Sequence, residues 1–90
     1  MSLRSFDWDE RNVEHLADHG ADPSEAEEVL RRNPYKRKIQ EEKWLAYGRT
    51  YDGRYLFVVF ALKGKNRIRV ITARDMTERE KSSTRKRFKG

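Results

Sequence analysis

The sequence predicts an α+β domain in which helices pack against an antiparallel sheet. Apolar residues recur with a helical period in the first third of the chain, and the period changes to two from residue 35 onward. The last segment begins with a helix-capping pattern. We therefore expect two N-terminal helices, a twisted antiparallel sheet of three to five strands and a C-terminal helix, in a single domain of residues 1–90.

The first helices are delimited by caps at both ends. Residues 5–8 alternate apolar and polar side chains, which indicates a short edge strand, and Asp9 is the expected N-cap of a helix over 10–19 that Gly20 ends. A second helix starts at Asp22-Pro23-Ser24-Glu25, where an Asp cap, a Pro in the first turn and a Glu three residues on occur together. Asn33-Pro34 ends it.

Strands and a last helix account for the remainder of the chain. Asp52-Gly53 and the residues 64–66 are turn signals between strands. Thr77 and Glu80 form a capping-box pattern for a helix over 78–88, which has almost no apolar stripe before Phe88. The four segments with strand character are 35–40, 44–51, 55–62 and 67–74.

Composition limits the classes of function. The 90 residues contain no cysteine, which excludes disulfides and thiolate zinc sites, and no stretch approaches the about 20 apolar residues of a membrane span. We expect a soluble cytoplasmic protein without a cofactor. Residues 1–33 carry four Lys and Arg against nine Asp and Glu, a net of −5, whereas residues 34–90 carry seventeen against six, a net of +11. This asymmetry favours an anionic partner for residues 34–90. Charged side chains that only keep a small protein hydrated would explain it too.

The segment Arg67-Ile-Arg-Val-Ile-Thr-Ala-Arg74 is the most informative stretch. Arg67 and Arg69 share one face of a predicted strand, and Arg74 stands at its end. A half-buried strand retains guanidinium groups where an anion meets them. We expect Arg67 and Arg69 to line one sheet face near Arg49, as a surface that binds phosphate.

Motifs along the chain resemble those of one known family. They are Phe6-x-Trp8-Asp9-Glu10, Asn12, His19-Gly20, Glu25-Ala26, Gly48-Arg49, Leu56 to Phe60, Arg67 to Arg74, Thr77 and Glu80. In this order and spacing they resemble the BrnT family of bacterial type II toxin–antitoxin toxins, which are ribonucleases with a RelE-like fold. The resemblance implies mRNA cleavage that inhibits translation, and neutralisation by a cognate antitoxin that is usually a DNA-binding dimer.

Two positions depart from the family pattern. Family members commonly have Lys before the His-Gly pair, where this chain has Asp18. They also commonly have Tyr four residues after the Glu of the last helix, where this chain has Thr84. The second departure raises an alternative: a catalytically weakened RelE-like module that binds antitoxin or nucleic acid. A DNA-binding regulator is disfavoured because no helix-turn-helix pattern is present.

A metal-independent ribonuclease needs a base, an acid and cations that stabilise the phosphorane. Arg49, Arg69 and Arg74 are the candidate cations, because the guanidinium group matches two phosphate oxygens. They could equally be partners of Asp or Glu, or contacts to the antitoxin. Lys43, Arg54, Arg67 and Arg79 are candidate RNA contacts or ordinary surface charges.

The proton-transfer candidates have structural alternatives. Glu80 is a candidate general base, but the capping box explains it equally well. His15 and His19 could serve as acid or base, or pack at the helix end; their spacing suits a metal, but no third ligand is evident, so no metal is expected. Aromatic residues interleaved with basic ones could stack on bases or fill the core: Trp44, Tyr47, Tyr51, Tyr55 and Phe57.

Overall fold

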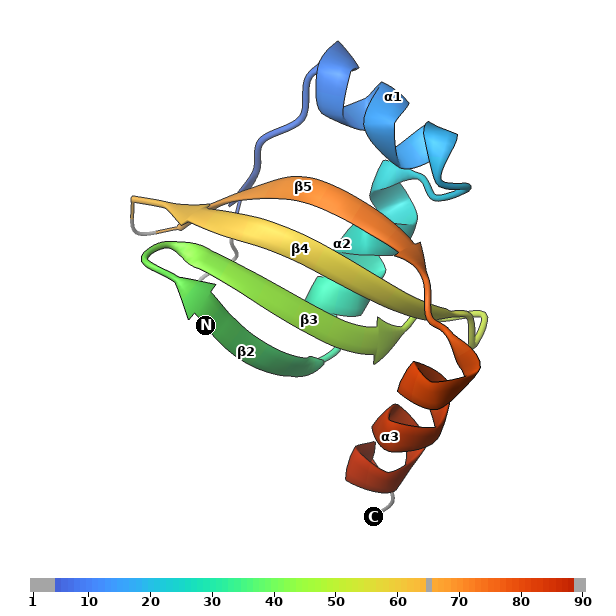
Figure 1. Cartoon of the computed structure of the whole chain (residues 1–90). Helices are drawn as coiled ribbons and strands as arrows, with labels where there is room; N and C mark the ends of the chain where they lie inside the picture. The colour runs from blue at the N-terminus through green and yellow to red at the C-terminus, as the bar shows by residue number, and fades with distance from the viewer. Residues whose placement is uncertain (1–4, 65, 89–90) are drawn as a thin grey trace.

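A five-stranded sheet forms the centre of the protein, in a computed structural model that describes residues 5–64 and 66–88 (Figure 1). The elements are β1 (Ser5–Phe6), α1 (Glu10–Asp18), α2 (Pro23–Arg31), β2 (Tyr35–Gln40), β3 (Lys43–Arg49), β4 (Tyr55–Lys63), β5 (Arg67–Asp75) and α3 (Glu78–Phe88). The strand order is β1-β5-β4-β3-β2. The predicted α+β class and element order are confirmed.

The sheet is mixed, which corrects the expectation of a purely antiparallel one. Strands β2 to β5 form an antiparallel meander, but β1 pairs with β5 in parallel. In Figure 1, α2 crosses behind the sheet, α1 lies above β5 and α3 stands at one end of the sheet in front. The predicted turn at 64–66 contains Lys65, which lies outside the described residues, as does the side chain of Phe88.

Strand alternation separates a buried face from an open one. Side chains of β4 that point towards α1 and α2 are buried, namely Leu56, Val58 and Phe60. Their neighbours Tyr55, Phe57 and Val59 point to the opposite face and are half-buried. At Gly48, an added Cβ would lie 3.1 Å from both Pro34 Cβ and Val29 Cγ1, so a glycine lets α2 approach β3 closely. The helices therefore cover one face and leave the other available.

Capping side chains fix the helix starts as the sequence predicts. The carboxylates of Asp9 and Asp22 accept hydrogen bonds from the backbone N–H groups of Asn12 and Glu25, 3.0 Å away in each case. The Asn12 side chain completes the first box and is 95% buried, because it also donates to the carbonyl oxygens of Asp7 (3.3 Å) and Val70 (3.1 Å). One side chain thus joins α1 to β5.

Helix α3 is held by polar contacts, since it has few apolar side chains. The predicted Thr77–Glu80 box is confirmed: the Thr77 N–H donates to Glu80 Oε1 at 2.9 Å, and the Glu80 N–H donates to Thr77 Oγ1 at 3.1 Å. Thr84 is fully buried and donates to Met76 Sδ at 3.4 Å.

None of the described helices is long and apolar enough to cross a membrane.

We predict that Asn12→Ala lowers the free energy of unfolding by about 2–3 kcal/mol, since it removes the donor to the buried Val70 carbonyl and the half-buried Asp7 carbonyl and half of a capping box. Urea unfolding measures the change. Glu14→Ala, at an exposed position of the same helix, is the matched control and should change stability by less than about 0.5 kcal/mol. Equal stabilities of the two variants would show that Asn12 does not join α1 to β5.

Candidate functional site

Three aromatic side chains form a row across the open face of the sheet. Tyr35, Tyr47 and Phe57 are register partners on β2, β3 and β4. The ring centroids of Tyr35 and Tyr47 are 6.3 Å apart in a stacked arrangement, and those of Tyr47 and Phe57 are 5.1 Å apart. We call this set the aromatic row. It offers flat, half-exposed apolar surfaces of the kind on which nucleic-acid bases stack.

An arginine lies over each end of the aromatic row. The Arg74 guanidinium carbon is 4.3 Å from the Phe57 ring centroid, and Arg74 is the register partner of Phe57 on β5. At the other end, the guanidinium carbon of Arg87 in α3 is 4.0 Å from the Tyr35 centroid. Both contacts are within the range of cation–π attraction. Positive charge therefore flanks the stacking surface at both ends.

Arg74 forms a two-pronged ion pair with Glu80. Its Nη1 and Nη2 atoms lie 2.9 and 3.1 Å from Glu80 Oε1 and Oε2, respectively. The hydrogen bond from Arg74 is the largest influence on Glu80 and lowers the pKa of its carboxyl group, with the Thr77 N–H adding to the effect. The same bond raises the pKa of Arg74. The pair is fully ionised at neutral pH, and the capping box holds its carboxylate at the start of α3.

A cleft of about 230 Å³ separates α3 from the aromatic row. It is lined by Tyr35, Arg37, Tyr47, Arg79, Glu80, Ser83, Thr84 and Arg87. Burial raises the pKa of the Tyr47 hydroxyl, and the Glu80 carboxylate adds to this increase, so the phenol stays protonated at neutral pH. Thr84 also lines the cleft, but its hydroxyl group donates a hydrogen bond to Met76 Sδ. The position where the family commonly has Tyr thus supplies no free phenol here.

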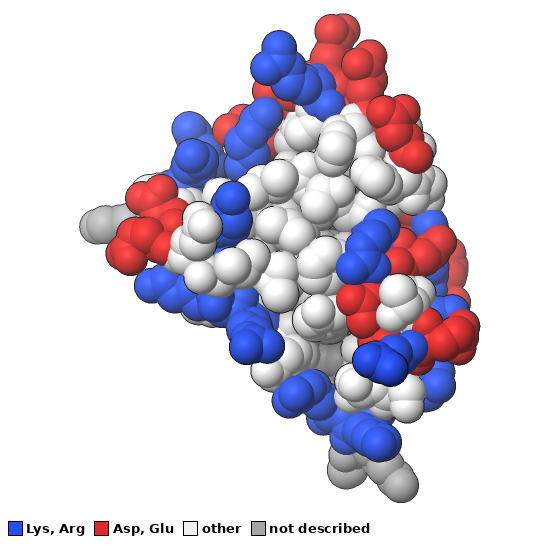
Figure 2. Space-filling model, in the orientation of Figure 1, with Lys and Arg blue, Asp and Glu red and all other residues white. Residues whose placement is uncertain are grey.

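Arg49 belongs to the same end of the open face. Its register partner is Tyr55, two positions along β4 from Phe57, which is roughly 7 Å. The guanidinium carbons of Arg49 and Arg85 lie 5.6 and 5.7 Å from the Tyr55 ring centroid. Among the residues that the structure describes, no carboxylate lies within ion-pair distance of Arg49. Figure 2 shows this face, with uncharged residues across its middle and Lys and Arg side chains, interspersed with Asp and Glu, along its borders.

The expectation that Arg67 and Arg69 lie near Arg49 is wrong. Arg69 is the register partner of Ala61, which is six positions from Tyr55 along β4, or roughly 20 Å. Arg67 pairs still farther along, with Lys63. The physical reason is the antiparallel meander, in which β5 starts at the end of the sheet opposite to the end of β3. Arg74, at the other end of β5, is the arginine of this strand that lies near Arg49.

Arg69 already has carboxylate partners within the chain. Its Nη2 lies 2.9 Å from Asp9 Oδ2, and its Nη1 lies 3.8 Å from Asp7 Oδ2. Lys43 is opposite Ala61 on the open face, so it stands at this far end together with Arg69. The structure therefore divides the predicted cations into two groups. Arg49 and Arg74 lie near α3 and Arg79 belongs to it, whereas Lys43, Arg67 and Arg69 lie at the opposite end of the sheet.

Arg54, a candidate RNA contact or surface charge, connects three parts of the fold. Its Nη1 is 2.7 Å from Glu25 Oε1, its Nε is 2.8 Å from Asp75 Oδ1, and its Nη2 donates to the Gly20 carbonyl at 2.7 Å. The hydrogen bond to Asp75 is the largest influence that raises the pKa of Arg54. Because each of its nitrogens is engaged, Arg54 has a structural role that explains its presence.

The two histidines lie apart from the Arg74–Glu80 pair. His15 and His19 are exposed on α1, with ring centroids 5.0 Å apart in an edge-to-face arrangement. His15 lines a shallow hollow together with Arg69 and Asp18. In Figure 1, α1 and α3 stand at opposite ends of the molecule. Within residues 5–64 and 66–88, no three His, Cys, Asp or Glu side chains are grouped as metal ligands.

Several residues around the site were not predicted from the sequence, and two of the stacking candidates lie away from the aromatic row. Tyr35, Arg37, Arg85 and Arg87 were not predicted to act, although Tyr35 and Arg37 share the open face by their spacing of two. Trp44, a candidate for stacking, is the register partner of the buried Phe60 and packs against the core on the helix side. Tyr51 lies in the β3–β4 loop and is 67% exposed, away from the aromatic row.

Comparison with known proteins identifies the family. A family model described as "Ribonuclease toxin, BrnT, of type II toxin-antitoxin system" matches residues 8–80. A search of curated proteins finds no match. Among solved structures, the crystal structure of the Brucella abortus ribonuclease toxin BrnT is similar, with a TM-score of 0.68, 21% sequence identity and coverage of 86% of this chain and 100% of that one. The fold is therefore that of BrnT, and the match over residues 8–80 shows that the chain belongs to the BrnT family of ribonuclease toxins of type II toxin–antitoxin systems.

Proposed function

We propose that this protein cleaves single-stranded mRNA without a metal ion, at the α3 end of the open sheet face. One observation carries the proposal. The aromatic row, which can stack bases, ends at Arg74, whose fork is held in place by Glu80. A stacking surface next to an oriented guanidinium group positions a base and its phosphate together.

In the proposed reaction, the ribose 2′-oxygen bonds to phosphorus and the bond from phosphorus to the 5′-oxygen breaks. Arg74 and Arg49 stabilise the negative charge that develops on the phosphoryl oxygens. The incoming phosphate competes with Glu80 for the two Nη groups of the Arg74 guanidinium. When Arg74 turns to the phosphate, Glu80 loses the partner that lowers the pKa of its carboxyl group, so it becomes a better base for the 2′-hydroxyl proton.

The leaving 5′-oxygen requires a proton donor. The Tyr47 hydroxyl lines the same cleft and is protonated at neutral pH, because burial and Glu80 raise the pKa of Tyr47. Arg79 and Arg87, which also line the cleft, extend the positive surface along the RNA strand. Each of these groups increases the rate of cleavage by a limited factor, since a positioned acid or base typically supplies about 10²–10⁴-fold.

The partner in this proposal is a cognate antitoxin, usually a DNA-binding dimer in the family, which covers the cationic face near α3. Four arginines stand there on or beside half-exposed aromatic rings: Arg49, Arg74, Arg85 and Arg87. An acidic surface with apolar side chains would complement both features. Blocking this face would prevent RNA from reaching Arg74.

We predict that Glu80→Gln reduces RNA cleavage by about 10²–10⁴-fold, because the amide retains the cap but accepts no proton. Arg74→Ala should cause a comparable loss by removing the phosphate fork. Cleavage of a fluorogenic single-stranded RNA by the purified protein measures both effects. Glu78→Gln, an exposed carboxylate in the same helical turn, is the control for Glu80→Gln and should cleave normally.

The rival assignment places the base on α1, where His15 lies beside Arg69. A fully active, folded Glu80→Gln variant together with an inactive His15→Gln variant would move the proposed site to that hollow.

Loss of cleavage on adding EDTA, restored by zinc or magnesium, would contradict the metal-independent mechanism. No growth arrest and no RNA cleavage by the parent protein would leave the binding module as the function.

We predict that amides of residues 78–88 exchange hydrogen faster in the free protein than in its complex with the antitoxin. Helix α3 has few apolar contacts of its own, and the antitoxin is proposed to cover it. Hydrogen exchange followed by mass spectrometry measures the difference. Residues 55–63 of the central strand β4 are the internal control, because they are paired on both sides in either state. Equal exchange of 78–88 in the two states would contradict the proposed contact.

A further inference from the structure

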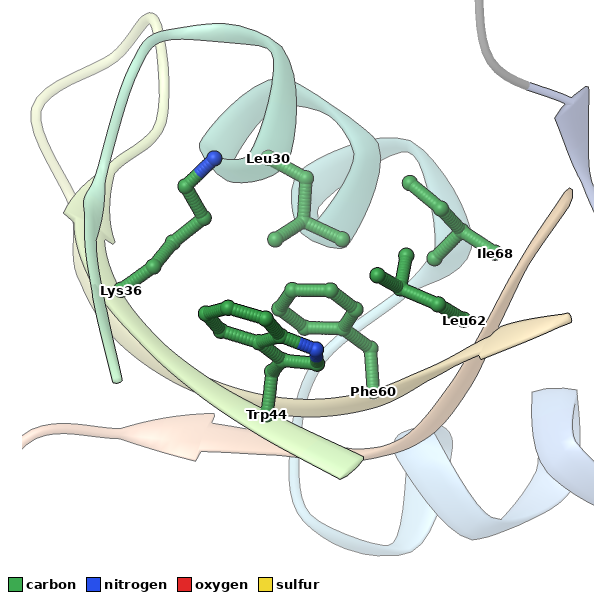
Figure 3. A pocket seen from close by; sticks show the side chains of 6 residues that line it. All are labelled: Leu30, Lys36, Trp44, Phe60, Leu62 and Ile68. Atoms are coloured by element: carbon green, nitrogen blue, oxygen red, sulfur yellow. The ribbon is translucent and has the colours of Figure 1, made fainter. Parts of the chain in front are cut away.

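An apolar pocket lies on the helix side of the sheet, on the face opposite to the aromatic row. Its walls are Leu30 of α2 and the side chains of Trp44, Phe60, Leu62 and Ile68 from the sheet, with Lys36 of β2 along one side. Figure 3 shows the Trp44 and Phe60 rings side by side beneath Leu30, with the Lys36 side chain rising next to them. Leu30, Trp44 and Leu62 are only partly buried, so the pocket reaches the surface.

The size of the pocket limits what it can hold. Its volume is about 120 Å³. An apolar cavity of about 150 Å³ in a protein holds one benzene molecule, so this pocket accommodates one branched aliphatic or small aromatic side chain. A nucleotide base would bring polar edges that these apolar walls cannot satisfy. The chemistry of the pocket therefore favours an apolar side chain of a protein over a nucleic acid.

The strand beside the pocket is an open edge of the sheet. Strand β2 is last in the strand order, and no described strand pairs with its outer side. Its backbone groups on that side can hydrogen-bond to an added strand. Lys36 and Lys38 are the register partners of Ala46 and Trp44, so both face the helix side, next to the pocket.

The charges of β2 select among the strands that could be added. Lys36, Arg37 and Lys38 are consecutive and exposed, so a second copy of β2 would be repelled, whereas an acidic strand would be attracted. Positive charge and the irregularity between Lys38 and Gln40 are also devices that protect an edge from aggregation. Protection alone requires no apolar pocket beside the edge, and the pocket is the feature that points to a ligand.

We propose that the outer edge of β2 and the adjoining pocket bind an acidic, extended segment of a partner protein. The segment pairs with the backbone of β2, its carboxylates face Lys36 and Lys38, and one long apolar side chain passes Lys36 into the pocket. This docking site uses the outer edge and the helix side of β2, whereas Tyr35 and Arg37 on the open face of the same strand line the cleft near α3. This inference rests on the proposed antitoxin partnership, with the antitoxin as the partner that supplies the segment.

Titration of the full-length, isotope-labelled protein with a synthetic peptide tests the proposal by NMR. The probe is a nine-residue peptide with Phe at its centre and Glu two residues to either side, because residues two apart lie on the same face of an extended strand. We expect saturable shifts of the β2 amides and the Trp44 indole N–H, and affinity about tenfold or more weaker when the central Phe is replaced by Gly. No saturable shift at about 1 mM peptide, or shifts confined to the open face, would overturn the proposal.

Charge reversal provides a second measurement. The double variant Lys36→Glu with Lys38→Glu should bind the peptide about tenfold or more weakly. Lys63→Glu with Arg67→Glu has the same change of charge at the β4–β5 end of the sheet and should bind like the parent. Equal binding by both double variants would overturn the docking site. The Lys36/Lys38 variant should still cleave RNA, so loss of peptide binding with intact cleavage separates this inference from the proposed function.

Discussion

The ion pair between Arg74 and Glu80 is the interaction on which the proposed site depends. It joins the end of β5 to the first turn of α3, and Glu80 simultaneously completes the capping box with Thr77. Because the side chains are 38% and 21% exposed, the pair contributes little to the free energy of unfolding, in line with other partly solvated pairs. Its consequence is orientation: the Arg74 fork is fixed over Phe57, at the end of the aromatic row.

Local features of the fold could be predicted from the sequence, because each depends on neighbouring residues. The caps at Asp9, Asp22 and Thr77 place three helix starts correctly, since a cap and its partner are three residues apart. The strand alternation likewise assigns Tyr47 and Arg49 to one face of β3. The parallel pairing of β1 with β5 was not predictable in this way, because it joins segments about 60 positions apart in the sequence.

The predicted grouping of the candidate arginines is wrong where it depends on the direction of the strands. The sequence names both Arg69 and Arg74 as candidate cations, because a guanidinium group matches two phosphate oxygens. In a meander the two ends of β5 belong to opposite ends of the sheet, and only Arg74 returns to Arg49. The carboxylate partners of Arg69 and Arg54 come from distant elements. These pairs also show that part of the charge asymmetry between the two halves of the chain is balanced by contacts between them.

The central claim is that Arg74 exchanges Glu80 for an RNA phosphate. The most direct test is the pKa of the Glu80 carboxyl group, measured by carbon NMR with and without a non-cleavable 2′-O-methyl oligonucleotide. In the free protein, Arg74 holds this pKa below its ordinary value. Loss of Arg74 to the phosphate, together with the added negative charge, should raise the Glu80 pKa in the complex. An unchanged or lower Glu80 pKa in a saturated complex would contradict the account.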